Sequence, residues 1–163
     1  MKTQEQLFRE ALIAVLPALR RYCFALTNSR PDGEDLLQAS VEKALSRWQQ
    51  FTPGTDMDRW MYRLCRNHWI DTVRAQRPQE EFEDDMMPDH EHHNPEALTL
   101  SQRSLEQLQH RIGQLSESLR MVLYLVAVEG RSYQETADIL DIPTGTVMSR
   151  LARARTRLAN AAE

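Results

Sequence analysis

Residues 131–159 read RSYQETADILDIPTGTVMSRLARARTRLA, a stretch that predicts two helices separated by a short turn. Ser132 and Glu135 have the S-x-x-E spacing of a capping box, in which each side chain accepts a backbone N–H at the start of a helix. The first helix should cover about residues 133–140, because Pro143 lacks a backbone N–H and cannot continue it. We expect a turn at residues 141–143 and a longer second helix that begins at Thr144 or its neighbour.

The second predicted helix has an apolar side and a basic side. At 3.6 residues per turn, the apolar stripe consists of Val147, Leu151, Ala154 and Leu158. Residues 144–159 contain four arginines and no acid. Such a helix fits the major groove of DNA, with its N-terminal residues at base edges and its arginines at phosphates or guanine. The alternative is a solvated basic face on a bundle helix, but the short helix and turn before it favour a helix-turn-helix.

Residues 130–158, GRSYQETADILDIPTGTVMSRLARARTRL, resemble the C-terminal promoter-binding region of extracytoplasmic-function (ECF) sigma factors of bacterial RNA polymerase, members of the sigma-70 family. The family motif G-T-V-k-S-R-l-x-R-A-R stands here as GTVMSRLARAR, with Met148 at a position that is often basic. The resemblance implies that the helix reads the −35 promoter element. The residues expected to contact DNA are Thr144, Thr146, Ser149, Arg150, Arg153 and Arg157.

The charge of the chain is unevenly distributed. The 163 residues carry a formal net charge of −4, and their number suits one domain or two small ones. Residues 78–102 contain eight acids and no lysine or arginine, whereas residues 59–77 contain five arginines and one acid, Asp71. A basic stripe inside an acidic chain fits a protein whose DNA contact is local.

The N-terminal part predicts two helices. Residues 7–27 have helical apolar spacing, and Pro17 should kink that helix or begin a new one. A loop is expected at residues 29–33, with Asp32 capping a helix that runs to about residue 50. Its buried stripe should be Leu37, Val41, Ala44 and Trp48.

One polar flank of that second helix carries Asp35, Gln38 and Glu42. Without the family, this flank is a solvated face. With the family, EDLLQASVEKAL resembles the sigma segment that docks on the clamp helices of the largest polymerase subunit. Family members commonly have Glu-Thr after the glutamine, where this chain has Ala39 and Ser40.

A further helix is predicted over about residues 58–76, DRWMYRLCRNHWIDTVRAQ. It resembles the sigma segment that melts and reads the −10 promoter element, W-L-y-r-I-a-r-N-x-x-I-D-x-x-R. The site residues implied here are Trp60, Arg63, Asn67, Asp71 and Arg74. In the family the loop before this helix captures a flipped base, so residues 51–56 should help to form a pocket. The alternatives are a surface pair between Asp71 and Arg74, and core packing for Trp69.

The segment between the two halves is acidic, contains proline and has few large apolar residues, so it should be a linker. His90, His92 and His93 suggest a metal site, but no neighbouring cysteine or helical spacing supports one, and no metal or cofactor is expected. Beyond the linker, a helical pattern includes Leu105, Leu108, Ile112 and Leu115, and a second helix should begin at Ser116 and end at Gly130. These two helices should form the floor of the helix-turn-helix.

We therefore expect an all-α chain of two small helical domains on a flexible acidic linker. Residues 1–77 should form a domain like sigma region 2, residues 78–97 the linker, and residues 98–163 a domain like sigma region 4. The resemblance implies an alternative sigma factor without catalytic residues, whose partners are core RNA polymerase (clamp helices and flap), promoter DNA and an anti-sigma factor. The phrase FTPGTDMDRW also resembles the general-stress branch of the family.

Two other functions stay open at this stage. The first is a stand-alone helix-turn-helix regulator that works without polymerase, and the second is a helical metalloenzyme that uses the histidines of the linker. Cys23 and Cys65 lie in apolar helical patterns and should be core thiols in a reducing cytoplasm. No signal peptide or membrane-spanning run is present in the sequence pattern, so we expect a cytoplasmic protein without membrane insertion.

Overall fold

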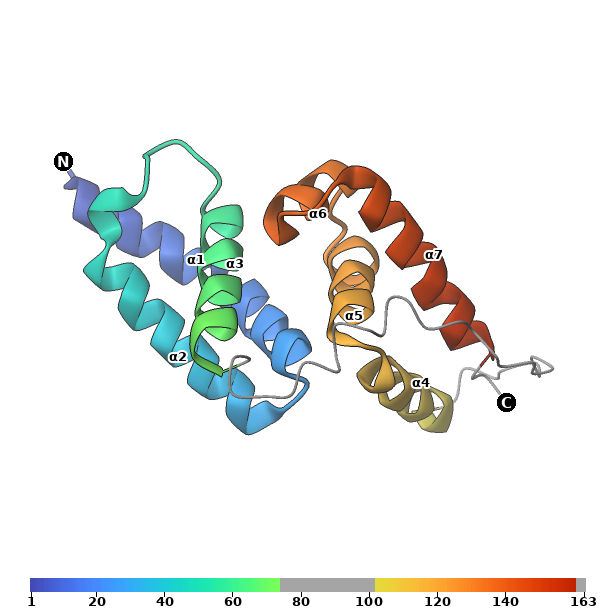
Figure 1. The fold of residues 1–163 in the computed structure, drawn as a ribbon. Helices are drawn as coiled ribbons and strands as arrows, with labels where there is room; N and C mark the ends of the chain where they lie inside the picture. The colour runs from blue at the N-terminus through green and yellow to red at the C-terminus, as the bar shows by residue number, and fades with distance from the viewer. Residues whose placement is uncertain (74–101, 161–163) are drawn as a thin grey trace. The chain divides into compact units, whose positions relative to one another are not determined.

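The computed structural model describes residues 1–73 and 102–160. The chain divides into two compact units, a first unit at Met1–Arg77 and a second unit at Pro78–Glu163. Within the described ranges every regular element is helical, which confirms the all-α class (Figure 1). None of the described helices is long and apolar enough to cross a membrane. The expected linker at residues 78–97 lies outside the described residues, as do its three histidines.

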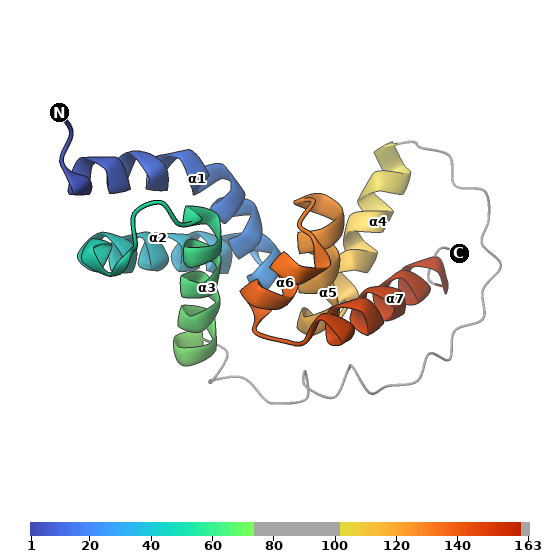
Figure 2. The ribbon, with the colours of Figure 1, turned by 90° about the horizontal axis from the view of Figure 1, so that it is seen from above.

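Three helices that pack on one another form the first unit (Figures 1 and 2). They are α1 (Gln4–Thr27), α2 (Arg30–Ser46) and α3 (Met57–His68), and a short 3-10 turn, η1 (Trp48–Gln50), follows α2. A π-helical turn, η2 (Trp69–Val73), continues α3. The core is built from the apolar stripes of all three helices and includes Leu19, Tyr22, Leu26, Leu36, Ala44, Met61, Tyr62 and Trp69.

The start of α2 differs from the sequence prediction. Residues 29–33 were expected to be a loop, with Asp32 as the cap of the next helix. Instead, α2 begins at Arg30 and its cap is Ser29, whose hydroxyl accepts the Asp32 backbone N–H at 3.3 Å. Pro31 lies in the first turn, where a backbone N–H has no partner within the helix, so the proline costs nothing there. The helix also ends earlier than predicted, at Ser46, and Trp48 therefore belongs to η1 and is half-buried.

Pro17 does not start a new helix, because α1 is continuous from Gln4 to Thr27. The carbonyl that loses its partner at Pro17 is that of Ile13, four residues earlier. Ile13 is 64% exposed, so water can reach the carbonyl on that side of α1. Figure 2 shows α1 bending near its middle, as a proline inside a helix predicts.

Cys23 on α1 and Cys65 on α3 lie in the core of the first unit, as their apolar patterns predict. Both are fully buried, and their sulfur atoms are 3.9 Å apart. The hydrogen bond to Cys65, together with burial, raises the pKa of the Cys23 thiol. This thiol therefore stays protonated and serves as an apolar packing group.

The described part of the second unit, residues 102–160, contains four helices: α4 (Gln102–Gln114), α5 (Glu117–Leu123), α6 (Tyr133–Leu140) and α7 (Thr144–Asn160). A π-helical turn, η5 (Tyr124–Val128), extends α5. Helix α7 packs on both α5 and α6. The capping of α5 by Ser116 is confirmed, since the Ser116 hydroxyl accepts the Leu119 backbone N–H. The guanidinium of Arg120 is buried and donates to the carbonyl of Leu115, which ties α5 to the end of α4.

The helix-turn-helix forms where the sequence predicts it. The Glu135 backbone N–H bonds the Ser132 hydroxyl at 3.0 Å, and the Ser132 N–H bonds the Glu135 carboxylate at 2.9 Å, which completes the capping box. At the other end of α6, Asp141 adopts a left-handed conformation with φ of 58°. The Asp141 and Ile142 backbone N–H groups both donate to Ala137, and the chain then turns through Pro143 into α7.

Helix α4 contributes less to the floor of the helix-turn-helix than expected. Leu105 is 53% exposed and Leu108 is 40% exposed, whereas Leu115 at the end of the helix is buried. The predicted apolar stripe is present, but only its C-terminal half faces the core of the second unit. Helix α4 does contact α7, as expected of the floor, but Leu105 and Leu108 do not take part in it.

Gly130 provides a test of the second unit's backbone. It follows η5 with φ of 72°, a conformation that an L side chain rarely adopts, although no atom lies within 4 Å of an added Cβ. Gly130→Ala should lower the free energy of unfolding of the second unit by about 1 kcal/mol. Circular dichroism during urea unfolding measures this change, and Gly145→Ala, at a helical glycine with equally open space, is the matched control. The three tryptophans lie in the first unit, so their fluorescence transition should not move.

A Gly130→Ala protein as stable as its parent would show that the left-handed turn does not constrain the end of η5.

Candidate nucleic-acid interface

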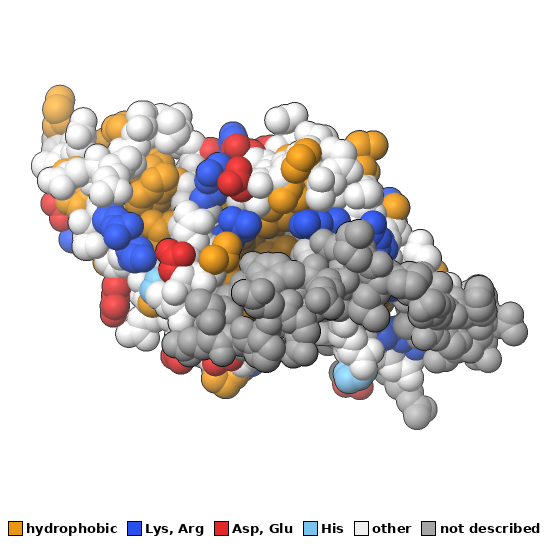
Figure 3. All heavy atoms as spheres, in the orientation of Figure 1, with side chains coloured by type: hydrophobic (Ala, Val, Ile, Leu, Met, Phe, Trp, Pro, Cys, Tyr) orange, Lys and Arg blue, Asp and Glu red, His pale blue; other side chains and the backbone are white. Residues whose placement is uncertain are grey.

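Helix α7 has the two sides that its sequence predicts. Val147, Leu151 and Ala154 are fully or almost fully buried, and Leu158 is half-buried. Ser149 is exposed, and the other predicted contact residues are half-exposed: Thr144, Thr146, Arg150, Arg153 and Arg157. Figure 3 shows Lys and Arg side chains on the visible face of the second unit, among hydrophobic and other side chains. The predicted residues therefore lie beside the buried stripe, on the side open to solvent.

The most exposed strip of α7 includes residues that the sequence reasoning left out. Gly145, Met148, Ala152 and Arg155 are all exposed. Gly145, Met148 and Ala152 carry no hydroxyl or guanidinium group, and Arg155 lies off the flank that Arg150 and Arg157 share. The helical period nevertheless places Gly145 and Ala152 opposite the buried stripe. The Ser149 hydroxyl lies on this strip and donates to the Thr146 carbonyl at 3.1 Å. Its oxygen therefore remains available to accept a hydrogen bond from outside.

Helix α3 presents a polar side to solvent. Arg63, Asn67 and Asp71 are exposed, and their spacing places them on one side of α3 and η2. Trp60 is half-buried and packs edge-on against Phe8 at 5.8 Å and Phe51 at 5.4 Å between ring centroids. Arg74 lies outside the described residues. The described residues of the predicted −10 site therefore lie on one side of α3 and η2, and Trp60 also belongs to an aromatic cluster with Phe8 and Phe51.

Trp69 and His68 have different environments. Trp69 is 1% exposed, so it is a core residue and does not offer its ring to a base. His68 is half-buried, and its Nδ1 is a buried atom without a hydrogen-bond partner in the structure. Loss of solvent lowers the pKa of His68, the nearby Lys43 lowers it further, and Asp71 opposes both effects. The imidazole is therefore biased towards its neutral form.

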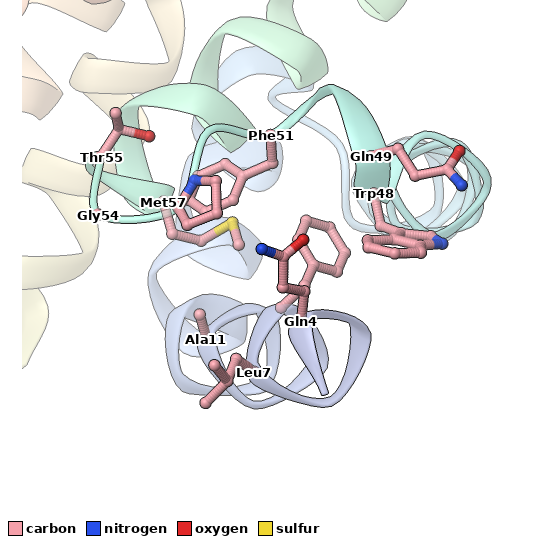
Figure 4. Close-up of a pocket in the computed structure, with 11 residues that line it drawn as sticks. Gln4, Leu7, Ala11, Trp48, Gln49, Phe51, Gly54, Thr55 and Met57 are labelled. Carbon is pink, nitrogen blue, oxygen red and sulfur yellow. The ribbon is translucent and has the colours of Figure 1, made fainter. Parts of the chain in front are cut away.

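A cavity of about 350 Å³ lies beside the loop that precedes α3. The loop side of its lining includes Phe51, Pro53, Gly54, Thr55 and Met57, and α1 supplies Gln4, Leu7, Phe8 and Ala11. Trp48 and Gln49 of η1 complete the wall, and Figure 4 shows the side chains of these three segments around the cavity. In Figure 3, hydrophobic side chains gather on the first unit between α1 and the segment that leads into α3.

This cavity changes the prediction for the base pocket. The sequence placed that pocket between residues 51–56 and the following helix. The loop does line the cavity, but the opposite wall comes from α1 and η1, and from α3 only Met57 contributes. Since α1 lies about 40 residues earlier in the chain, no local pattern could reveal this wall.

The polar side of α2 is also exposed. Asp35, Gln38 and Glu42 all face solvent on one side of the helix. Ser40 is 0% exposed and belongs to the core, whereas Ala39 is half-exposed. Of the two residues that depart from the family's Glu-Thr, only Ala39 can therefore remove a polar group from the exposed side of α2.

No group of three or more His, Cys, Asp and Glu side chains within the described ranges could hold a metal ion. The three linker histidines that suggested one lie outside those ranges.

The order of the two units matches two known sequence families. Residues 12–66 match the family "Sigma2 domain of PhyR", and residues 105–158 match "Sigma-70, region 4". The first match covers most of the three-helix unit, including the exposed face of α2 and α3 as far as Arg66, and the second covers the helix-turn-helix. The fold, the exposed polar sides of α2, α3 and α7, and these two matches therefore define a sigma factor of the sigma-70 type.

Curated relatives narrow this class. The chain is 34% identical to the ECF RNA polymerase sigma-E factor of Salmonella typhimurium strain LT2, over 80% of this chain and 74% of that protein. It is 27% identical to the ECF RNA polymerase sigma factor EcfG of Rhodopseudomonas palustris strain TIE-1, over 92% of this chain and 82% of the relative. The chain belongs to the family of ECF RNA polymerase sigma factors. It is an alternative sigma factor that directs transcription, and a stand-alone regulator is not favoured.

Solved structures agree with this assignment. The sigma factor RpoE, solved in complex with the anti-sigma factor NepR from Bartonella quintana, superposes with a TM-score of 0.73 at 28% identity, over 94% of this chain and 95% of that one. CnrH, solved with the cytosolic domain of CnrY, gives a TM-score of 0.63 at 22% identity and supports the fold.

The environment of His68 predicts a pH dependence of stability. The pKa of His68 is lowered in the folded state, so the unfolded chain, with a histidine pKa of about 6.5, binds the proton more tightly. This contribution to stability is complete above about pH 6.5 and is lost as the pH falls through the lower folded-state pKa. His68→Asn should therefore reduce the difference in free energy of unfolding between pH 7.5 and pH 5.5, measured by tryptophan fluorescence.

His68 is the one histidine in residues 1–77, and His110→Asn in the second unit serves as the control. If the free energy of unfolding of His68→Asn depended on pH as that of the parent does, the lowered pKa of His68 would not be the cause of the pH dependence.

Proposed function

We propose that the first unit docks on core RNA polymerase and reads the −10 element, and that the second unit reads the −35 element. The boundaries are residues 1–77 for the first function, 78–97 for the connector and 98–163 for the second. The observation that carries this division is the pair of exposed polar sides, one on α3 and one on α7, each held in place by a buried stripe on the same helix.

Helix α7 reads duplex DNA in this proposal. Arg150, Arg153 and Arg157 have donors that suit guanine O6 and N7 or phosphate oxygens. The Ser149 hydroxyl, which already donates to Thr146, is left as an acceptor for the amino group of adenine or cytosine. Thr144 and Thr146 lie in the first turn, where a recognition helix meets the bases.

The first unit opens and reads the −10 element. Arg63, Asn67, Asp71 and Arg74 would contact the separated strand, with Trp60 held in position by Phe8 and Phe51. One flipped base would enter the cavity between α1, η1 and the loop, where Trp48 and Phe51 supply aromatic rings. Extruding a base costs a few kcal/mol, and stacking on an aromatic side chain returns about 1–3 kcal/mol. The amides of Gln4 and Gln49 can bond its edge.

The side of α2 formed by Asp35, Gln38 and Glu42 would dock on the clamp helices of the largest polymerase subunit, and the second unit would contact the flap. Polymerisation belongs to the partner, so this chain supplies no catalytic residue. We further propose that it acts in the cytoplasm, where the polymerase is.

An anti-sigma factor completes the set of proposed partners. RpoE of Bartonella quintana was solved with the anti-sigma factor NepR, and this chain covers nearly all of that sigma factor. The match of residues 12–66 to the Sigma2 domain of PhyR also supports a place in the general-stress branch. A NepR-type inhibitor is therefore the form of regulation that we propose for this chain.

Arg153 tests the −35 assignment. Arg153→Ala in the reconstituted holoenzyme should weaken binding to promoter DNA about 5- to 150-fold if the side chain reads a base, because such a contact is worth about 1–3 kcal/mol. If Arg153 bonds phosphate, binding to all sequences should fall alike and the salt dependence should become less steep. Gel shifts on promoter and −35 variants at several salt concentrations separate the two cases.

Arg111→Ala removes the same charge from α4, outside α7, and is the matched control. Equal binding by Arg153→Ala and its parent under all salt conditions would remove α7 from the reading role.

Gln38 tests the docking assignment. Gln38→Ala removes an exposed amide from the centre of the polar side of α2 and should weaken the affinity for core polymerase by about 3- to 10-fold, as expected for the loss of one or two hydrogen bonds. Fluorescence anisotropy of labelled protein with core enzyme measures the affinity. Gln50→Ala, an equally exposed glutamine in η1, should leave it unchanged. The docking assignment fails if both variants bind like the parent.

A further inference from the structure

We propose that Met148 is a specificity-determining residue of α7, whose side chain contacts the C5 methyl group of a thymine in the −35 element. The inference rests on the proposed reading of the −35 element by α7. It adds a base identity and a residue that neither the family match nor the predicted contact set assigns.

Met148 has an unusual place for a large apolar side chain. It is 53% exposed, whereas its neighbour Val147 is 0% exposed and belongs to the core. Burial in the second unit therefore does not account for it. It is the fifth residue of α7, within the N-terminal part of the helix that meets base edges in a helix-turn-helix protein.

The helical period gives the exposed side of α7 two edges. Met148 and Arg155, seven residues apart, lie along one edge, and Arg150 and Arg157 lie along the other. Between the edges, residues 145–152 include Gly145, Ser149 and Ala152, all small and all exposed, whereas Arg153 and Thr156 follow further along the helix.

The small residues between the edges permit a close approach to DNA. A Cβ added at Gly145 would meet no protein atom within 4 Å, so the fold itself leaves this side of the helix open. With little side-chain bulk on this side in the first turns, the N-terminal part of α7 can lie deep in a groove, and arginines on both edges can reach phosphates. Met148, on the first turns, then lies at the depth of the base edges.

The chemistry of the thioether selects its contact. Methionine has no N–H or O–H to donate, so it cannot bond a phosphate or the acceptors of guanine. The apolar group in the floor of the major groove is the C5 methyl of thymine. A basic residue at this position would contact phosphate, which is present in every DNA sequence. A contact of Met148 with a thymine methyl group instead depends on the base.

The experiment removes the methyl group from DNA rather than from the protein. A −35 element is first selected from a randomised promoter library with the reconstituted holoenzyme. Each thymine of that element is then replaced by deoxyuridine, which lacks the C5 methyl and keeps the base pair. Gel shifts compare the parent, Met148→Ala and Leu105→Ala, a matched loss of an exposed apolar side chain on α4.

The parent should lose about 3- to 5-fold in affinity at one deoxyuridine position, as expected for one buried methyl group. Met148→Ala should bind the thymine promoter more weakly by a similar factor and should not respond to deoxyuridine at that position. Leu105→Ala should behave like the parent in both tests.

Three results overturn the inference: a selected −35 element without thymine, a parent that ignores every deoxyuridine replacement, or a Met148→Ala protein that still responds to the replacement. Arg153→Ala distinguishes this failure from that of the proposed function. If it loses binding while Met148 makes no difference, α7 reads the element without Met148. If neither variant changes binding, the −35 assignment itself fails.

Discussion

Burial of one side of a helix decides which side the other residues present. In α3 and η2, the most deeply buried side chains are at most 1% exposed: Met61, Tyr62, Cys65 and Trp69. This packing against α1 and α2 leaves Arg63 and Asn67 in solvent. In α7, burial of Val147, Leu151 and Ala154 leaves the hydroxyl-bearing residues and the arginines on the side that faces solvent. Turning either helix about its axis would expose several large apolar side chains at about 1.5–3 kcal/mol each. The hydrophobic core of each unit therefore determines which side of the helix faces solvent. The exposed polar residues need no hydrogen bonds to one another to keep this orientation.

The turn between α6 and α7 adds the second constraint. Asp141 takes a left-handed conformation, the Asp141 and Ile142 N–H groups bond Ala137, and the carbonyl of Pro143 accepts the Thr146 N–H at 3.0 Å. The Ala137 carbonyl in the last turn of α6 and the Thr146 N–H in the first turn of α7 are thereby satisfied within a few residues. With α6 anchored by its capping box, α7 has a defined direction relative to α5 and α6. Its arginines and its small residues consequently share one solvent-facing surface.

The sequence predicted the second unit better than the first for physical reasons. A capping box, a proline and a strong 3.6-residue period mark α6 and α7 locally, so their starts were predicted correctly. The start of α2 was missed because Pro31 was taken as a loop residue, although proline is favoured in a first helical turn. The exposure of Leu105 and Leu108 was missed because periodicity identifies an apolar stripe but does not say whether another element covers it.

The candidate site divides in the same way. The exposed groups on α2, α3 and α7 follow from helical spacing, and their relation to polymerase and promoter followed from the family resemblance. The cavity did not follow, because its walls come from α1, η1 and the loop, which are distant in sequence. The cluster of Trp60 with Phe8 and Phe51 was missed for the same reason. Met148 was noted only as a departure from the family motif, and its exposure gave it a chemical meaning.

The most direct test of the account is promoter-dependent initiation by the purified chain. Sigma-free core RNA polymerase from the same host, mixed with this protein and no inhibitor, should produce run-off transcripts from a promoter that carries both elements. Scrambling either element alone should abolish most of the product. Transcription that requires only one element would contradict the division between two reading units, and a complete lack of promoter-dependent transcripts would contradict the account as a whole.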